Sequence, residues 1–283
     1  MNSLSGCLLI NKRCGVTSRT EVNDISHILH EKRCGHIGTL DPFATGLLIV
    51  LVGKATKISP FLERADKTSV ATLKLGQKTD TGDLDGNVIL ESKIPSLTKE
   101  KVEKILASFL GEQEQIPPMY SALKKDGKHL YDYARVGIEI QRVARKINIH
   151  NIKLIEFTDN IVKFEAHVSK GTYIRTLGED IAEKLGTVGH LIALDRTSVG
   201  EFKLSDAIES KNVTSDSLIS IDQIMNFMPS HFVEGKEAFK ACNGVALNID
   251  SKEEEIVIKD KDGIIAVYKR NENGLYSCLR GFR

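Results

Sequence analysis

The stretch from Arg33 to Leu48, RCGHIGTLDPFATGLL, constrains this chain more than any other. An unbroken apolar run, Leu47 to Val52, follows it. The helix-like apolar pattern before it consists of Val22, Ile25, Ile28 and Leu29. Glycines, a proline and threonines predict a loop, and the apolar run predicts a buried strand that holds the loop from one side.

Asp41 is the carboxylate of this predicted loop. Pro42 follows it, fixing its own φ and lacking a backbone donor, so the local backbone is stiff. His36 and Thr39 are the nearest other polar side chains. A rigid loop with an acid and an imidazole is a typical functional site. The structural alternative is that Asp41 bonds its own turn and His36 is an ordinary surface imidazole.

Composition excludes several classes of protein. The 283 residues suffice for one large and one small domain, and 41% apolar with 27% charged residues fits a globular chain. Five cysteines without a C-x-x-C pair predict neither a disulfide framework nor a zinc site, and we expect no metal. No apolar run reaches membrane-spanning length and no signal segment is present, so we expect a cytoplasmic protein without membrane contact.

One segment is locally basic although the whole chain carries only +1. Residues 124–146 include seven basic and three acidic side chains, so the net charge of this segment is +4. The basic residues are Lys124, Lys125, Lys128, Arg135, Arg142, Arg145 and Lys146. Tyrosines at 120, 131 and 133 lie beside or among them. This pattern is typical of phosphate contacts with base stacking, and a solvated charged surface is the alternative.

Hydrophobic periodicity predicts both helices and strands. Alternation predicts strands at Thr68–Leu75, Ile147–Phe157 and Ile161–Val168, and Cys7–Ile10 is a short apolar strand. A 3.6-residue pattern predicts a helix from Leu97 to Leu110. Short strand signals at 255–259, 264–269 and 276–279 predict a small β-rich tail after Pro229.

The segment S-K-G-T-Y-I-R-T-L, residues 169–177, carries a second group of candidate residues. Tyr173 and Arg175 occupy alternate positions, so in an extended segment they would point to the same face. A helix is expected to follow, ending at Leu185. A core tyrosine and a surface arginine are the alternative reading.

Four motifs together resemble one family. G-H-x-G-T-L-D-P-x-A-T-G-x-L, beginning at Gly35, resembles the catalytic motif of the TruB family of tRNA pseudouridine synthases. L-G-x-x-T-D-T-x-D-x-x-G from Leu75, P-P-M-Y-S-A-x-K from Pro117, and the segment 169–177 follow in the family's order. The resemblance covers about residues 8–228.

The resemblance implies a fold and an activity. The fold is α+β, a mixed and mainly antiparallel sheet with packed helices, in a catalytic domain at 1–228. The tail at 229–283 resembles, loosely, the family's small accessory RNA-binding domain. The activity is isomerisation of uridine to pseudouridine at position 55 in the T-loop of tRNA, with base flipping and without metal or cofactor. We expect a monomer whose partner is the tRNA T-arm.

The resemblance also assigns roles to residues. Asp41 is the catalytic carboxylate, and whether it attacks the sugar, attacks the base or abstracts a sugar proton stays open. Arg175 pairs with Asp41, and Tyr173 lines the pocket. His36 fills the space that the flipped base leaves. The remaining RNA-contacting residues are Thr39, Asp80, Lys124, Lys128, Arg142, Arg145 and Lys170, and the insert at about 124–146 holds phosphates.

Ser69 departs from the family, which has a tyrosine there. That aromatic ring stacks on the target base and is placed to assist proton transfer. Without it, another aromatic substitutes, or turnover is slow, or the chain is a tRNA-binding or folding protein with weak or lost catalysis. A carboxylate hydrolase unrelated to RNA is a third reading, which needs a second acid that the sequence does not reveal.

Overall fold

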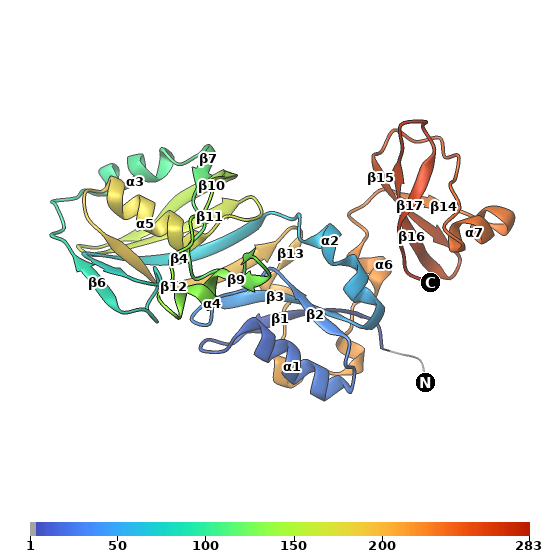
Figure 1. The fold of residues 1–283 in the computed structure, drawn as a ribbon, viewed down its shortest axis with the longest axis horizontal. Coiled ribbons are helices and arrows are strands. Elements are labelled where there is room, and N and C mark those ends of the chain that lie inside the picture. Colours follow the sequence, from blue (N-terminus) through green and yellow to red (C-terminus); the bar gives the residue numbers. More distant parts are fainter. Residues whose placement is uncertain (1–3) are drawn as a thin grey trace.

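The computed structural model describes residues 4–283 and is built on a mixed nine-stranded sheet (Figure 1). Its main path runs β1-β3-β12-β4-β11-β10-β7, with β2 on β3 and β13 on β12. The strands are β1 (Gly6–Lys12), β2 (Cys34–Ile37), β3 (Thr45–Val52), β4 (Lys67–Leu75), β7 (Gly111–Gln115), β10 (Arg145–Phe157), β11 (Ile161–Val168), β12 (Gly189–Val199) and β13 (Phe202–Lys203). All pairings are antiparallel except β3 with β12. The predicted α+β class is confirmed.

Helices cover both faces of this sheet. They are α1 (Ser18–Leu29), α2 (Ser59–Leu62), α3 (Lys99–Ala107) and α5 (Ile174–Lys184), and the 3-10 turn η1 (Gly53–Ile58) precedes α2. Helices α1, α3 and α5 pack in one apolar cluster, and η1 and α2 pack in the other. The Thr17 hydroxyl accepts from the Thr20 N–H and caps α1. Helices α3 and α5 lie together over one end of the sheet (Figure 1). Val102 and Leu106 of α3 pack into the same apolar cluster as Leu177 of α5.

The parallel pairing of β3 with β12 sets the position of the candidate site. Arg196 of β12 lies opposite Gly46 at the start of β3, and on its other side it pairs with Ser69 of β4. The loop that carries Asp41 ends where β3 begins. Segments that are far apart in sequence therefore meet near this loop.

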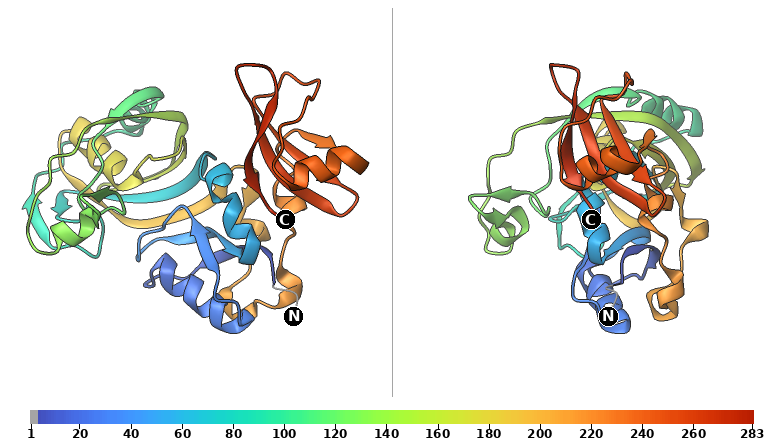
Figure 2. Two further views of the ribbon diagram at one scale, coloured as in Figure 1. Left: turned by 45° about the vertical axis from the view of Figure 1, so that its right-hand side comes forward. Right: turned by 90° about the vertical axis from the view of Figure 1, so that its right-hand side faces the viewer.

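Two hairpins project near the same region. One consists of β5 (Gln77–Thr79) and β6 (Val88–Glu91). The other is part of the basic insert and consists of β8 (Lys124–Lys125) and β9 (Lys128–His129), followed by α4 (Leu130–Ala134). The insert stands out from the body of the molecule (Figure 2).

The C-terminal residues form a separate four-stranded sheet in the order β14-β15-β16-β17. Its elements are β14 (Ser230–Phe232), α7 (Gly235–Cys242), β15 (Glu255–Asp260), β16 (Gly263–Arg270) and β17 (Tyr276–Gly281). The connection from β13 contains η2 (Leu204–Asp206), η3 (Ser210–Asn212), η4 (Ser215–Ser217) and α6 (Ile221–Ile224). Val257, Val267 and Phe282 share one buried cluster with Leu9 and Ile49 of the central sheet, so the two parts pack firmly.

The structure corrects three sequence expectations. Residues 34–37 form β2 along β3, although glycines there predicted a loop. Arg175 lies in the first turn of α5, with Tyr173 at its N-cap, so the two do not share an extended segment. Ile28 is 42% exposed, and the buried face of α1 holds Val22, Ile25 and Leu29 without it. The tail also contains α7 and β14, which the sequence pattern did not reveal.

Candidate active site

Two buried polar side chains hold the loop around Asp41. The Lys12 ammonium, 1% exposed, donates to the backbone carbonyls of Pro42 and Ala44 at 3.2 and 2.7 Å. The Ser18 hydroxyl accepts from the Leu40 N–H at 2.9 Å and lies 3.1 Å from the Leu40 carbonyl. Burial lowers the pKa of Lys12 to about 8. The backbone on both sides of Asp41 is therefore fixed.

Arg175 is the main partner of Asp41. Its Nη2 donates to Asp41 Oδ1 at 2.9 Å, and its Nε lies 2.8 Å from Oδ2, so the guanidinium contacts both carboxylate oxygens through one hydrogen bond and one ion-pair contact. The remaining donors reach the backbone carbonyls of Thr81 and Tyr120, each at 2.7 Å. The Arg175 side chain is 4% exposed, whereas that of Asp41 is 32% exposed. Arg175 therefore fixes the orientation of the Asp41 carboxylate from the protein interior, while part of the carboxylate remains accessible to a substrate.

Asp83 is a second acid at this site, and it was not among the residues predicted from the sequence. Its Oδ2 lies 3.4 Å from Arg175 Nη1, and its side chain is 6% exposed. Burial raises the pKa of the Asp83 carboxyl, while the Thr81 hydroxyl and the Arg175 charge oppose the rise. The only signal in the sequence was the acid-rich stretch 80–85, in which Asp80 was chosen instead.

Tyr173 is held through its backbone. The Gln115 side chain, 4% exposed, accepts from the Tyr173 N–H at 2.8 Å and donates to its carbonyl at 3.1 Å. Burial raises the pKa of the Tyr173 phenol, and the charges of Arg145 and Arg175 partly oppose this. Gln115 was not among the predicted residues, because a single glutamine gives no distinctive signal.

His36 lies on β2 at the edge of the loop. Its Nε2 is 3.2 Å from the Thr39 hydroxyl. Burial, together with the charges of Arg19 and Arg196, lowers the pKa of His36 to about 4. The imidazole is therefore a neutral ring at pH 7, as suits contact with a base more than contact with a phosphate.

Ser69 lies on β4, directly opposite Arg196 of β12. It is 5% exposed, so neighbouring groups already cover the position. Arg196 is buried as well and donates to the carbonyls of Leu47 and Gly38, both at 2.8 Å. Asp41 is the charge that raises the pKa of Arg196, against the larger lowering by burial. Ser69 and Arg196 thus lie close to the Asp41 loop.

The predicted RNA-contacting residues fall into two groups. Asp80 and Arg142 line a cavity of about 580 Å³ that also reaches Arg175, between the β5–β6 hairpin and the insert. The Asp80 carboxylate accepts from the Asn87 N–H at 2.9 Å and so also shapes the hairpin turn. The other group is exposed and contains Lys124, Lys128, Arg145 and Lys170.

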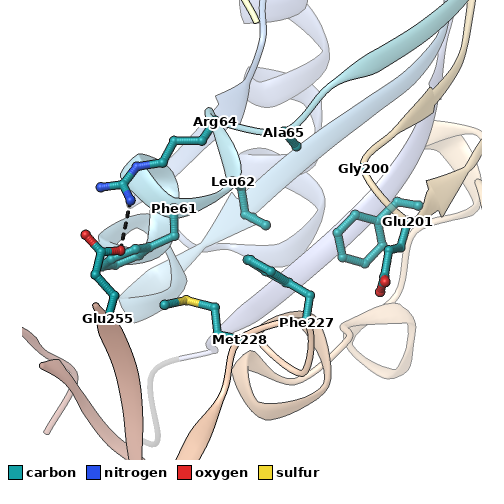
Figure 3. A pocket seen from close by; sticks show the side chains of 10 residues that line it. Phe61, Leu62, Arg64, Ala65, Gly200, Glu201, Phe227, Met228 and Glu255 are labelled. Atoms are coloured by element: carbon teal, nitrogen blue, oxygen red, sulfur yellow. Dashed lines mark hydrogen bonds and ion pairs between the residues drawn. The ribbon is translucent and has the colours of Figure 1, made fainter. Parts of the chain in front are cut away.

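A second cavity, about 450 Å³, lies at the junction with the C-terminal sheet (Figure 3). Its walls are mainly apolar and include Phe61, Leu62, Phe227 and Met228. Arg64 and Glu255 form an ion pair of 2.8 Å beside it. No residue of the Asp41 cluster lines this cavity, so it is separate from the candidate site.

Within residues 4–283, no group of three or more His, Cys, Asp or Glu side chains is arranged to hold a metal ion. Over the same residues, no helix has the length and apolarity needed to cross a membrane.

Comparison with known proteins identifies the family. Residues 26–174 match the TruB family pseudouridylate synthase N-terminal domain, and residues 175–225 match the tRNA pseudouridylate synthase B C-terminal domain. The tRNA pseudouridine synthase B of Hydrogenovibrio crunogenus is 44% identical over 257 residues, which cover 90% of this chain and 85% of that protein. The protein of the same name from Azoarcus sp. is 49% identical, covering 85% of this chain and 82% of that protein.

A solved structure of a Cbf5-Nop10-Gar1 complex has the same fold. It superimposes with a TM-score of 0.75 at 23% identity, covering 98% of this chain and 85% of that chain. At this identity the match supports the architecture, in agreement with the sheet described above. With both family domains matched and relatives similar over most of their length, the chain belongs to the TruB family of pseudouridylate synthases.

Proposed function

We propose that this chain isomerises uridine to pseudouridine at position 55 in the T-loop of tRNA. As a family member it is an isomerase of uridine in tRNA. The assignment to position 55 rests on the resemblance of its motifs to those of the family. The observation that carries the proposal is the Asp41–Arg175 pair on a fixed loop. The pair presents one oriented carboxylate to a substrate, and the buried Arg175 covers the side of the carboxylate that faces the protein interior.

The isomerisation requires one bond to break and another to form. The N1–C1′ glycosidic bond is cleaved, the uracil turns, C5 bonds to C1′, and C5 loses its proton while N1 gains one, so the product is an isomer of the substrate. Asp41 is the nucleophile: its carboxylate forms a transient bond to the nucleotide that is broken again later in the reaction, which divides the exchange into two easier steps. Arg175 holds the carboxylate in place through its contacts to both oxygens.

RNA contacts divide between two surfaces. The insert supplies exposed cations for phosphates, including Lys124, Lys128 and Arg145. His36, a neutral ring beside the loop, occupies the space left by the flipped base. Tyr173 lines the pocket below the uracil. Lys170, Thr39, Asp80 and Arg142 complete the contacts that we propose for the T-arm.

The organisation of the molecule follows from this activity. We propose a catalytic domain at 1–228 and an accessory domain at 229–283, acting as a monomer in the cytoplasm on the T-arm. The site is built from one chain, because the Asp41 loop, Arg175 and Tyr173 all come from it. Nothing in the comparisons favours loss of catalysis. Because Ser69 stands where the family has a tyrosine, the rate of pseudouridine formation is the quantity to measure.

The test is incubation with unmodified tRNA followed by base-resolved pseudouridine detection. We expect modification at position 55 with wild type and none with Asp41→Asn. A tRNA carrying cytidine at position 55 is the matched substrate control. Modification of another uridine, with position 55 untouched, would refute the assignment of the position.

A further inference from the structure

Two cationic side chains meet at one point of the Asp41 loop. A Cβ built on Gly38 would lie 3.2 Å from Lys67 Cε and 3.2 Å from Arg196 Nη1. Gly38 has φ +64°, so its left-handed backbone and its lack of a side chain both keep this point open. Lys67 and Ser69 are two residues apart on β4 and therefore face the same side of the sheet.

Neither cation has a carboxylate partner at ion-pair distance within residues 4–283. Arg196 is 4% exposed and uses Nε and Nη2 for backbone carbonyls, while its Nη1 makes no hydrogen bond to any described residue. Lys67 is partly buried, and its Nζ donates to the Ala65 carbonyl at 2.8 Å. Positive charge that is buried without an acid is unfavourable unless an anion compensates it.

We propose that Lys67, with Arg196 beside it, binds the phosphate group that flanks the target uridine. This rests on the proposed function, because tRNA supplies the anion. The two cations touch the loop three residues before Asp41, close to where the flipped nucleotide must enter. The exposed lysines of the insert are separate from this point and contact phosphates further along the RNA.

The charges around Lys67 predict how this site responds to pH. Burial lowers the pKa of Lys67 to about 8, and Arg196 and Lys170 add to the lowering. Asp66 and Glu63 oppose it. A bound phosphate favours the protonated amine and raises its pKa. The contribution of Lys67 to binding is therefore complete below pH 8 and is lost as pH rises through the raised value.

The experiment measures the Kd of a T-arm stem-loop at pH 7 and pH 9. For wild type we expect about tenfold weaker binding at pH 9, because most free Lys67 is then neutral. Lys67→Arg stays charged and should bind equally at both pH values, whereas Lys67→Met should bind weakly at both. Lys74→Met, on the opposite face of the same strand, is the matched control and should behave as wild type.

A modified RNA locates the phosphate. Neutral methylphosphonates replace, one at a time, the phosphates on the 5′ and 3′ sides of the target uridine. One of them should weaken binding to wild type but not to Lys67→Met, since the contact is already absent there. Equal losses in both proteins at both positions, or equal pH dependence in wild type and Lys67→Arg, would overturn the proposal. Pseudouridine formation by wild type on the unmodified stem-loop shows separately whether the proposed function holds.

Discussion

Replacing Ser69 by tyrosine tests how much an aromatic ring at this position, where the family has a tyrosine, contributes to the rate of isomerisation. The side chain lies on β4 opposite Arg196, beside the Asp41 loop. A tyrosine there would extend over this loop and provide a face for the flipped uracil. We expect Ser69→Tyr to raise the single-turnover rate, because wild type must orient the base without that ring.

The size of the effect follows from stacking and from space. Stacking of a base on an aromatic side chain contributes about 1–3 kcal/mol, and a tenfold rate increase needs only about 1.4 kcal/mol in the transition state. Ser69 is 5% exposed, so the larger tyrosine ring must displace the neighbouring groups that now cover the serine. Overpacking of this kind costs about 1–3 kcal/mol of folding free energy, which lowers Tm by a few degrees.

The assay combines saturating enzyme, unmodified tRNA and rapid quenching, with tRNA affinity and Tm measured in parallel. We expect at least a tenfold faster chemical step and nearly unchanged affinity, since phosphates dominate binding. Ser69→Ala is the matched control and should leave the rate close to that of wild type. An unchanged or lower rate in a folded Ser69→Tyr protein would refute the reasoning and show that another residue does this work.

Three further variants test the remaining roles. Asp41→Asn should abolish pseudouridine formation while Tm stays within a few degrees, and retained activity with a large fall in Tm would instead identify a turn residue. Arg175→Met should cost at least about a hundredfold in rate and also lower Tm, because it leaves the buried Asp83 carboxylate without its cation and two backbone carbonyls without their donor, contacts that Arg175 keeps in Asp41→Asn. Replacing Arg142 and Arg145 by alanine should weaken tRNA binding and flatten its salt dependence, with the single-turnover rate of bound complexes unchanged.

The regular strands could be predicted because their residues alternate. Residues 161–168 and 147–157 have a buried face and a more exposed face, and β11 has the predicted bounds while β10 begins two residues earlier. The strand β2 escaped prediction because its four residues are too few to show a periodicity, glycines occur in and after it, and its pairing with β3 joins segments that are apart in sequence. Helix α5 begins at Ile174, earlier than its sequence pattern indicates, because Tyr173 caps it without a side-chain hydrogen bond and so gives no capping signal.

The site was only partly accessible from the sequence. Asp41 and Arg175 could be predicted because the motifs that carry them resemble those of the family, whereas spacing alone favours a turn residue at Asp41. Asp83, Gln115 and Lys12 escaped because each acts through a partner that is distant along the chain. A buried lysine that donates to three backbone carbonyls has no signature in composition or spacing.

The charges near Asp41 explain why the net charge of the chain said little about its partner. The charged side chains at the loop and next to it include three cations, Lys12, Arg175 and Arg196, and three carboxylates, Asp41, Asp83 and Asp195. Lys67 also reaches the loop, and neither Lys67 nor Arg196 has a carboxylate at ion-pair distance within residues 4–283. A chain of net charge +1 can therefore hold an uncompensated positive point beside Asp41. An anionic backbone that reaches the loop meets this local charge, and the fields of distant acids are screened beyond about 10 Å.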